Sequence, residues 1–186
     1  MKFLLSKPWL STTSSSLALS CLLTLSLSAW AAGNEPNSFS SNVDDPEWVE
    51  TDAPPPPAFD VSKLVMFDVS INSALTYGVD PSTVRISPRD GLVRYVVVAE
   101  SKSGARNVLY EALRCATGEY KTYARYTPEG NWSMVSEPKW KSMFGNMPSR
   151  HPLRLARAGG CENAAPPSSV ASMISRMKTV NYGPND

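Results

Sequence analysis

Four glycine-containing turns divide the middle of the sequence into segments too short for long helices. Gly91, Gly104, Gly118 and Gly130 follow one another at intervals of 12 to 14 residues, and the first three come directly after Asp, Ser or Thr. Glycine after such a residue supplies the positive φ that tight turns need. The spacing therefore predicts a series of β-hairpins and an antiparallel sheet.

The segments between these turns have the length and the β-branched or aromatic content of strands. Connections this short exclude the crossovers that parallel strands require. Along 119–127, tyrosine, threonine and alanine alternate with Lys121, Tyr123 and Arg125, which predicts that the charged side chains face solvent. The predicted meander has about six strands: 64–69, 83–86, 94–100, 106–115, 119–127 and 131–135.

The C-terminal third has helical periodicity instead. Residues 152–158 begin with proline and end at Gly159-Gly160, as a short helix does. After Ser168, apolar residues recur at helical spacing and predict an amphipathic helix packed on the sheet: Val170, Met173, Ile174, Met177 and Val180. The predicted class is α+β, mainly β, with one or two C-terminal helices.

The N-terminus has the features of a secretory signal peptide. Lys2 and Lys7 precede an apolar run at 17–30, and Ala29-Trp30-Ala31 offers small residues at both cleavage positions. Cleavage is predicted after Ala31, which places the mature chain in the periplasm or cell envelope. The run is shorter than the roughly 18 residues of a membrane span, so no transmembrane span is expected in the mature chain. An uncleaved anchor and lipidation at Cys21 are weaker alternatives.

Removal of residues 1–31 leaves two cysteines, Cys115 and Cys161. Cysteines of exported chains usually pair because the compartment is oxidising. Catalytic redox pairs usually lie only two residues apart, so a structural disulfide is predicted. The mature chain is long enough for one domain, expected at 61–186.

Residues 32–60 form an acidic, proline-rich arm. Seven acidic residues and no basic residue occur from Glu35 to Asp60, and Pro54 to Pro57 are consecutive, which favours an extended conformation. Residues 61–186 have a formal charge of +6. Two arrangements stay open: the arm folds back on the domain with Trp48 as an anchor, or it is a solvated leader.

His151 is the single histidine, and any Ser–His or Cys–His chemistry would use it. Arg150, Arg154 and Arg157 surround it in sequence and disfavour the imidazolium that a general base forms, so an exposed residue at a helix start is predicted. The sequence has no nucleophile elbow, phosphate loop or dinucleotide fingerprint. After the predicted cleavage one histidine and two cysteines remain, fewer than the four usual ligands of a zinc cluster, and no cofactor or metal is expected.

Arg150, Arg154 and Arg157 have spacings that place them on one helix face. With His151 they would bind an anionic lipid, glycan or phosphate; the alternatives are a solvated basic face or a docking surface for the arm. Nucleic acid is not an expected partner, because the mature chain is nearly neutral in charge. A carboxylate pair such as Glu100 and Glu111 leaves a small envelope hydrolase as a less favoured possibility.

Three stretches carry a family resemblance: Asp90 to Tyr95, Ser103 to Cys115 and Glu119 to Ala124. They resemble the cryptic neisserial protein family, and the similarity extends from about Asp44 to Met177. The resemblance implies an exported proteobacterial protein with one uncharacterised domain, and it supplies no catalytic residues. The favoured function is therefore a non-catalytic interaction or assembly module of the envelope, with a protein partner and possible peripheral contact with anionic lipid.

Overall fold

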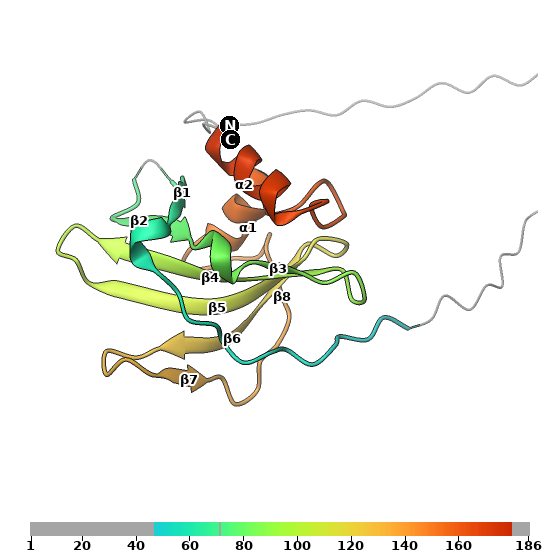
Figure 1. Ribbon diagram of the computed structural model, residues 1–186, viewed down its shortest axis with the longest axis horizontal. Helices are drawn as coiled ribbons and strands as arrows, with labels where there is room; N and C mark the ends of the chain where they lie inside the picture. The colour runs from blue at the N-terminus through green and yellow to red at the C-terminus, as the bar shows by residue number, and fades with distance from the viewer. Residues whose placement is uncertain (1–46, 71, 180–186) are drawn as a thin grey trace, which may run out of the picture. The chain divides into compact units, whose positions relative to one another are not determined.

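The computed structural model describes residues 47–70 and 72–179. The predicted signal peptide, the first half of the arm and Val180 therefore lie outside the described residues. The described residues form an open antiparallel sheet of eight strands in the order β1-β2-β4-β5-β6-β7, where β3 also pairs with β4 and β8 with β6. Two short C-terminal helices pack on it, which confirms the α+β class (Figure 1).

The predicted meander forms the centre of the sheet. Strands β4 (Leu92–Ser101), β5 (Arg106–Arg114), β6 (Glu119–Tyr126) and β7 (Trp132–Met134) pair in sequence order. Gly104 and Gly118, which lie between them, have φ angles of 83° and 65°. The predicted segments 64–69 and 83–86 contain β1 (Val65–Phe67) and β3 (Arg85–Ile86).

Two strands were not predicted: β2 (Leu75–Val79), which lies between β1 and β4, and β8 (Lys141–Ser142). β2 contains Gly78, a residue type that usually weakens a strand. A Cβ atom there would lie 2.8 Å from Met66 Sδ and 2.9 Å from Leu64 Cβ. Glycine therefore lets the edge strand β1 approach β2 closely.

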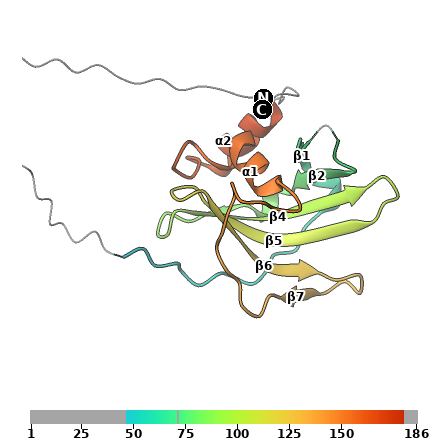
Figure 2. The ribbon, with the colours of Figure 1, turned by 180° about the vertical axis from the view of Figure 1, so that it is seen from behind.

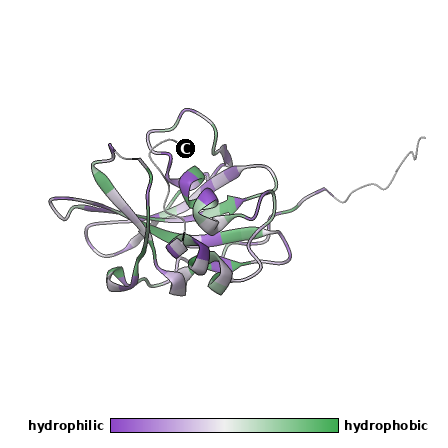
Figure 3. Ribbon diagram, turned by 90° about the horizontal axis from the view of Figure 1, so that it is seen from above, coloured by the Kyte–Doolittle hydropathy of each residue, from purple (hydrophilic) through white to green (hydrophobic). Residues whose placement is uncertain are grey.

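The helices cover one face of the sheet. Helix α1 (His151–Leu155) continues into the wider turn η3 (Ala156–Gly160), and helix α2 follows at Val170–Thr179. Two single helical turns, η1 (Val61–Lys63) and η2 (Pro81–Thr83), lie earlier in the chain, before the central strands. Met173 and Met177 of α2 are buried in the main core. Figure 3 shows that other parts of the helices are hydrophilic. Gly159 has a φ of 144°, and a Cβ there would lie 2.7 Å from the Met173 carbonyl oxygen. Glycine thus allows η3 and α2 to touch.

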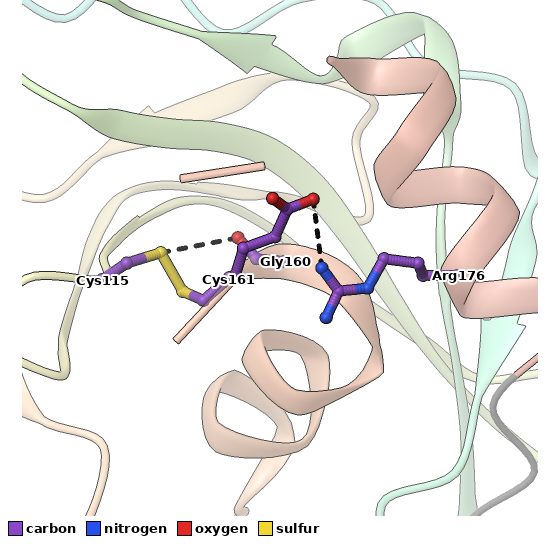
Figure 4. Close-up of a disulfide and its surroundings, with 5 residues drawn as sticks. Cys115, Gly160, Cys161 and Arg176 are labelled. Carbon is purple, nitrogen blue, oxygen red and sulfur yellow. Dashed lines mark hydrogen bonds and ion pairs between the residues drawn. A yellow bond between two sulfur atoms is a disulfide. The ribbon is translucent and has the colours of Figure 1, made fainter. Parts of the chain in front are cut away.

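The predicted disulfide joins the central sheet to the helical layer (Figure 4). Cys115 directly follows β5 and Cys161 directly follows η3, and their Cα atoms are 5.7 Å apart. Arg176 of α2 pairs with Glu162 at 3.0 Å beside the bridge. The covalent link and this ion pair hold the two helical segments together over the end of β5.

Residues 47–60, here called the arm segment, lie on the other face of the sheet. Figures 1 and 2 show the domain from opposite sides and place the arm segment, in cyan, and helix α1, in orange, on opposite faces. Ala53 and Phe59 pack on a second apolar cluster of strand residues: Val96, Val98, Val108, Tyr110, Ala112, Tyr123 and Ala124. Of the two arrangements left open by the sequence, this segment adopts the folded-back one.

Trp48 anchors the start of the arm segment, as the sequence suggested. Its indole Nε1–H donates to the Asp90 carbonyl oxygen at 2.8 Å. The Arg114 guanidinium lies 3.6 Å from the centroid of the indole ring, and Trp140 contacts the ring edge-on at 5.9 Å. The residue is held by a hydrogen bond, a cation–π contact and an aromatic contact at once.

Glu50 binds two side chains of β6 and the side chain of the residue that directly precedes β8. Lys121 pairs with its carboxylate, the Tyr123 hydroxyl donates to it at 2.6 Å and the Trp140 indole donates at 3.1 Å. Burial alone would raise the pKa of Glu50, but the hydrogen bonds from Lys121 and Tyr123 lower it below its usual value. The arm segment covers Lys121, whose side chain is only 11% exposed. The prediction that the charged side of β6 faces solvent is therefore wrong at this residue.

A β-bulge further along β6 changes which of its side chains share a face. The register with β5 shifts between Tyr110 and Glu111, so that Tyr110 faces Ala124 while Glu111 faces Thr122. The extra residue, Tyr123, interrupts the strict alternation of faces. Tyr123 and Ala124 both join the cluster under the arm segment, whereas Thr122 turns to the helical side.

Asp90 and Arg94 form a buried ion pair beneath the arm segment. Their side chains are 0% and 3% exposed, with 2.8 Å between Arg94 Nη2 and Asp90 Oδ2. The backbone N–H of Thr51 donates to the same carboxylate oxygen at 3.1 Å, and the Thr51 hydroxyl binds it as well. Burial alone would raise the pKa of Asp90, but hydrogen bonds from Arg94, Ser87 and Thr51 hold it well below its usual value.

Candidate functional site

A buried carboxylate, Glu111, lies on the helical side of β5. It is 1% exposed and is surrounded by core residues. The hydroxyl of Tyr95 donates to its Oε2 at 3.2 Å, and the hydroxyl of Thr122 donates to its Oε1 at 2.8 Å. Burial and then the nearby Glu111 carboxylate raise the pKa of Tyr95 well above its usual value, so this hydroxyl keeps its proton and donates. A buried carboxylate of this kind needs such partners, since unpaired it would be very costly.

His151 supplies the third partner and corrects the sequence prediction. It is the first residue of α1, as expected, but it is 7% exposed instead of solvent-facing. Its Nε2 lies 2.8 Å from Glu111 Oε2, and its ring stacks on the Tyr77 ring with 5.6 Å between centroids. The ring is buried because its partner, 40 residues earlier in the chain, is itself buried in the sheet.

Ser149 extends the network towards the surface. Its Oγ lies 3.1 Å from His151 Nδ1 and 3.0 Å from the Tyr77 hydroxyl, and it accepts the backbone N–H of His151 at 3.3 Å. These partners assign the tautomer: when Nε2–H donates to Glu111, the neutral ring accepts at Nδ1. The Ser149 hydroxyl then donates to His151. Ser149, His151 and Glu111 form one connected line of hydrogen bonds.

A hollow of about 230 Å³ opens beside this line. It is bounded by the segment between β1 and β2 and by the residues before α1. Five of its lining residues have polar side chains: Ser70, Asn72, Ser73, Ser149 and Arg150. This lining suits a polar ligand. Tyr77, whose hydroxyl contacts Ser149, also lines the hollow.

The arginines predicted to bind an anion occupy different environments. Arg150 is exposed and lines the hollow, Arg154 is half-buried on α1, and Arg157 is exposed on η3. The polar contacts described for the arm segment are with residues of the sheet and its connections, including Asp90 and Lys121. The arm segment therefore docks on the opposite face from α1, not on these arginines.

The carboxylate pair considered for a hydrolase is not formed. Glu100 pairs with Arg106 at 2.5 Å near the end of β4. Strand alternation places Glu100 on the face of Val96 and Val98, whereas Glu111 lies on the helical face. The two carboxylates are thus separated by the sheet.

A larger hollow, of about 910 Å³, lies between residues 84–91 and 166–170. Its wall consists mainly of serines, prolines and aliphatic side chains, with Arg85 as its charged residue. Arg85 Nη1 already donates to the carbonyl oxygens of Ser82 and Val84. The smaller hollow is the better candidate, because it adjoins the buried Glu111 and His151.

Residues 47–70 and 72–179 contain neither a cluster of metal ligands nor a membrane-spanning helix. In these ranges no three His, Cys, Asp or Glu side chains converge in a way that would hold a metal ion. No helix in the same ranges has the length and apolarity needed to cross a membrane.

The comparison with protein families decides the relationship. The model of the CNP1-like family matches residues 43–178, which include β1 to β8 and nearly all of α2. The chain belongs to the CNP1-like family. No curated protein and no solved structure matches it. The CNP1-like match covers the arm segment, Glu111, Ser149 and His151 within one family unit.

In this CNP1-like chain the sequence did contain one local signal for the site. Glu111 is the single charged residue of the apolar run from Val108 to Leu113. A charged residue within such a run is buried only when it is paired, so the run indicated that Glu111 has a partner in the core. Ser149 had no such signal. Its contact with His151 depends on how the chain enters α1, which residue types alone did not indicate.

Proposed function

We propose that this CNP1-like chain is an exported cell-envelope protein and that its domain is an interaction module recognising an anionic group of a ligand or partner. Export is supported by the charged start, the apolar run at 17–30 and the small residues before position 32. The bridge between Cys115 and Cys161 is consistent with an oxidising compartment.

The observation that carries the binding proposal is the position of Arg150 on a polar hollow. Its guanidinium is exposed and offers several donors, while Ser70 and Asn72 line the same wall; the Ser73 hydroxyl is already bonded to the backbone of Leu75. A guanidinium matches the two oxygens of a carboxylate or phosphate. The volume of about 230 Å³ suits a small anion or one head group.

Replacing Arg150 with alanine is expected to weaken phosphate binding by roughly tenfold or more, since a hydrogen bond to a charged group contributes about 1.5–3 kcal/mol. The measurement is an NMR titration of residues 32–186 with inorganic phosphate. Arg157→Ala is the matched control, because Arg157 is equally an exposed arginine of the same segment. Equal weakening by both variants would favour a diffuse basic face; no shift of residues around Ser149 in the wild type would contradict the proposal.

A second part of this experiment distinguishes a lipid head group from a soluble anion. Vesicles of phosphatidylglycerol and phosphatidylcholine replace free phosphate, at low and high salt. Binding to the anionic vesicles that disappears with salt and with Arg150→Ala indicates a lipid head group. Phosphate binding without vesicle binding indicates a soluble ligand or a protein partner.

Expression of the full chain in a Gram-negative host should yield a mature protein that begins at Ala32 and lacks two hydrogens. The signal-peptide features predict this cleavage, and the bridge accounts for the lost hydrogens. Intact-mass measurement of the periplasmic fraction tests both. An uncleaved chain confined to the cytoplasm would contradict the proposed location.

A further inference from the structure

We propose that Ser149 is the nucleophile of an acyl-transfer site, with His151 as its general base and Glu111 as the group that orients His151. This goes beyond the binding proposed above and rests on the same hollow admitting a ligand. The three side chains come from the segment before α1, from α1 itself and from β5. Tyr77, Ser149 and Arg150 line the hollow in which a substrate would lie.

The distances meet the requirements of an activated serine. A nucleophile and its base must lie within hydrogen-bond reach, and a third group must hold the base. Ser149 Oγ is 3.1 Å from His151 Nδ1, and His151 Nε2 is 2.8 Å from Glu111. The ring cannot easily turn, because it is buried and stacked on Tyr77 at an interplanar angle of 10°.

The charge balance differs from the one predicted from sequence. The neighbouring arginines were expected to disfavour an imidazolium, but Arg150 is exposed and its charge is screened by water. The Glu111 carboxylate touches the ring inside the core, where charges interact more strongly. The carboxylate contacts Nε2, which leaves Nδ1 directed at Ser149.

The reaction follows from these positions. Ser149 Oγ attacks the carbonyl carbon of a small ester while its proton moves to His151 Nδ1. The bond to the alkoxy group breaks, that group leaves as an alcohol with the proton from Nδ1, and Ser149 is left acylated. Water then attacks the acyl carbon, gives a proton to Nδ1 and releases the carboxylic acid as Ser149 recovers its hydrogen. The hollow restricts the substrate to a short acyl ester, and Arg150 favours one with an anionic group.

A purely structural role for Ser149 is the competing explanation. Its Oγ accepts the backbone N–H of His151, an arrangement found at helix starts. That role needs no exposure and no contact with the imidazole. Ser149 instead remains partly exposed on the wall of a hollow.

Covalent labelling with diisopropyl fluorophosphate tests the proposal on the oxidised chain 32–186. Attack by Ser149 breaks the P–F bond and forms a P–O bond, and peptide mass spectrometry locates the adduct. We expect an adduct on Ser149 that is lost in Ser149→Ala and kept in Ser70→Ala, whose hydroxyl lies in the same hollow. His151→Gln should slow labelling by about 100-fold or more, the usual contribution of a general base.

Several results would overturn it: no adduct on the folded wild type, equal labelling of Ser149 and Ser70, or labelling of Ser149 that His151→Gln does not change. If the His151 variant does not fold, the comparison of Ser149 with Ser70 in the wild type still decides. Phosphate shifts around Arg150 without any adduct would refute the chemistry and leave the binding module intact. Absence of both would refute the two proposals together.

Discussion

Replacing Asp90 with alanine is expected to destabilise the domain by about 3–5 kcal/mol, because the Arg94 charge would remain buried without its partner. The variant also removes the acceptor of the Thr51 hydroxyl and backbone N–H. Urea unfolding at pH 7 measures the loss. Asp68→Ala is the control, since Asp68 is an exposed aspartate.

The loss should depend on pH in a defined direction. Folding lowers the pKa of Asp90 from its usual value of 3.8. The ionised carboxylate therefore contributes its full stabilisation above about pH 4, and this contribution is lost as the pH falls through the lowered pKa of the folded protein. The difference between wild type and Asp90→Ala should be full at pH 7 and shrink only below about pH 4. Adding Arg94→Met to Asp90→Ala should recover part of the stability. A loss no larger than that of Asp68→Ala would contradict this account.

Reduction of the bridge between Cys115 and Cys161 is expected to cost about 4 kcal/mol. The estimate comes from the entropy of closing a loop of about 47 residues in the unfolded chain. Urea unfolding with and without a phosphine reductant measures it, and the double variant Cys115→Ala/Cys161→Ala should reproduce the loss. The reductant should have no further effect on that double variant. A loss below about 1 kcal/mol would mean that the packing of η3 on β5 already fixes this region.

The central sheet could be predicted because its signals are local. Glycine turns mark the ends of β4, β5 and β6, and the strands between them are rich in residues that favour extended structure. The disulfide could be predicted because two cysteines remain after the predicted signal cleavage. β2 was not predicted because Gly78 usually interrupts a strand, whereas its purpose here is to admit the side chains of Leu64 and Met66.

The candidate site could not be assembled from the sequence because its contacts are non-local. Glu111 and His151 are 40 residues apart, and Tyr77 and Ser149 are 72 apart. The three arginines near His151 suggested a basic, exposed helix start. The burial of the imidazole depends on α1 packing over β5, which no pattern around His151 indicates.

The face of β6 was misassigned for a different reason. Alternation along a strand is strict only while the register holds, and one extra residue reverses it. The bulge at Tyr123 places Ala124 on the face of the arm segment and Arg125 opposite Leu109, whereas Lys121 precedes the bulge and is covered because Glu50 of the arm segment binds it. The irregularity and the non-local docking of the arm segment together account for the misassignment.

The docking of the arm segment has a consequence for the order in which the chain folds. Glu50 precedes its partners Lys121, Tyr123 and Trp140 by 71, 73 and 90 residues. A chain synthesised from its N-terminus presents Glu50 long before those partners emerge. The apolar side of β4 and β5 then stays uncovered until the C-terminal half arrives, and contacts of such high order form slowly. We expect closure of the arm segment to be the late step of folding, during which the nascent domain depends most on chaperones.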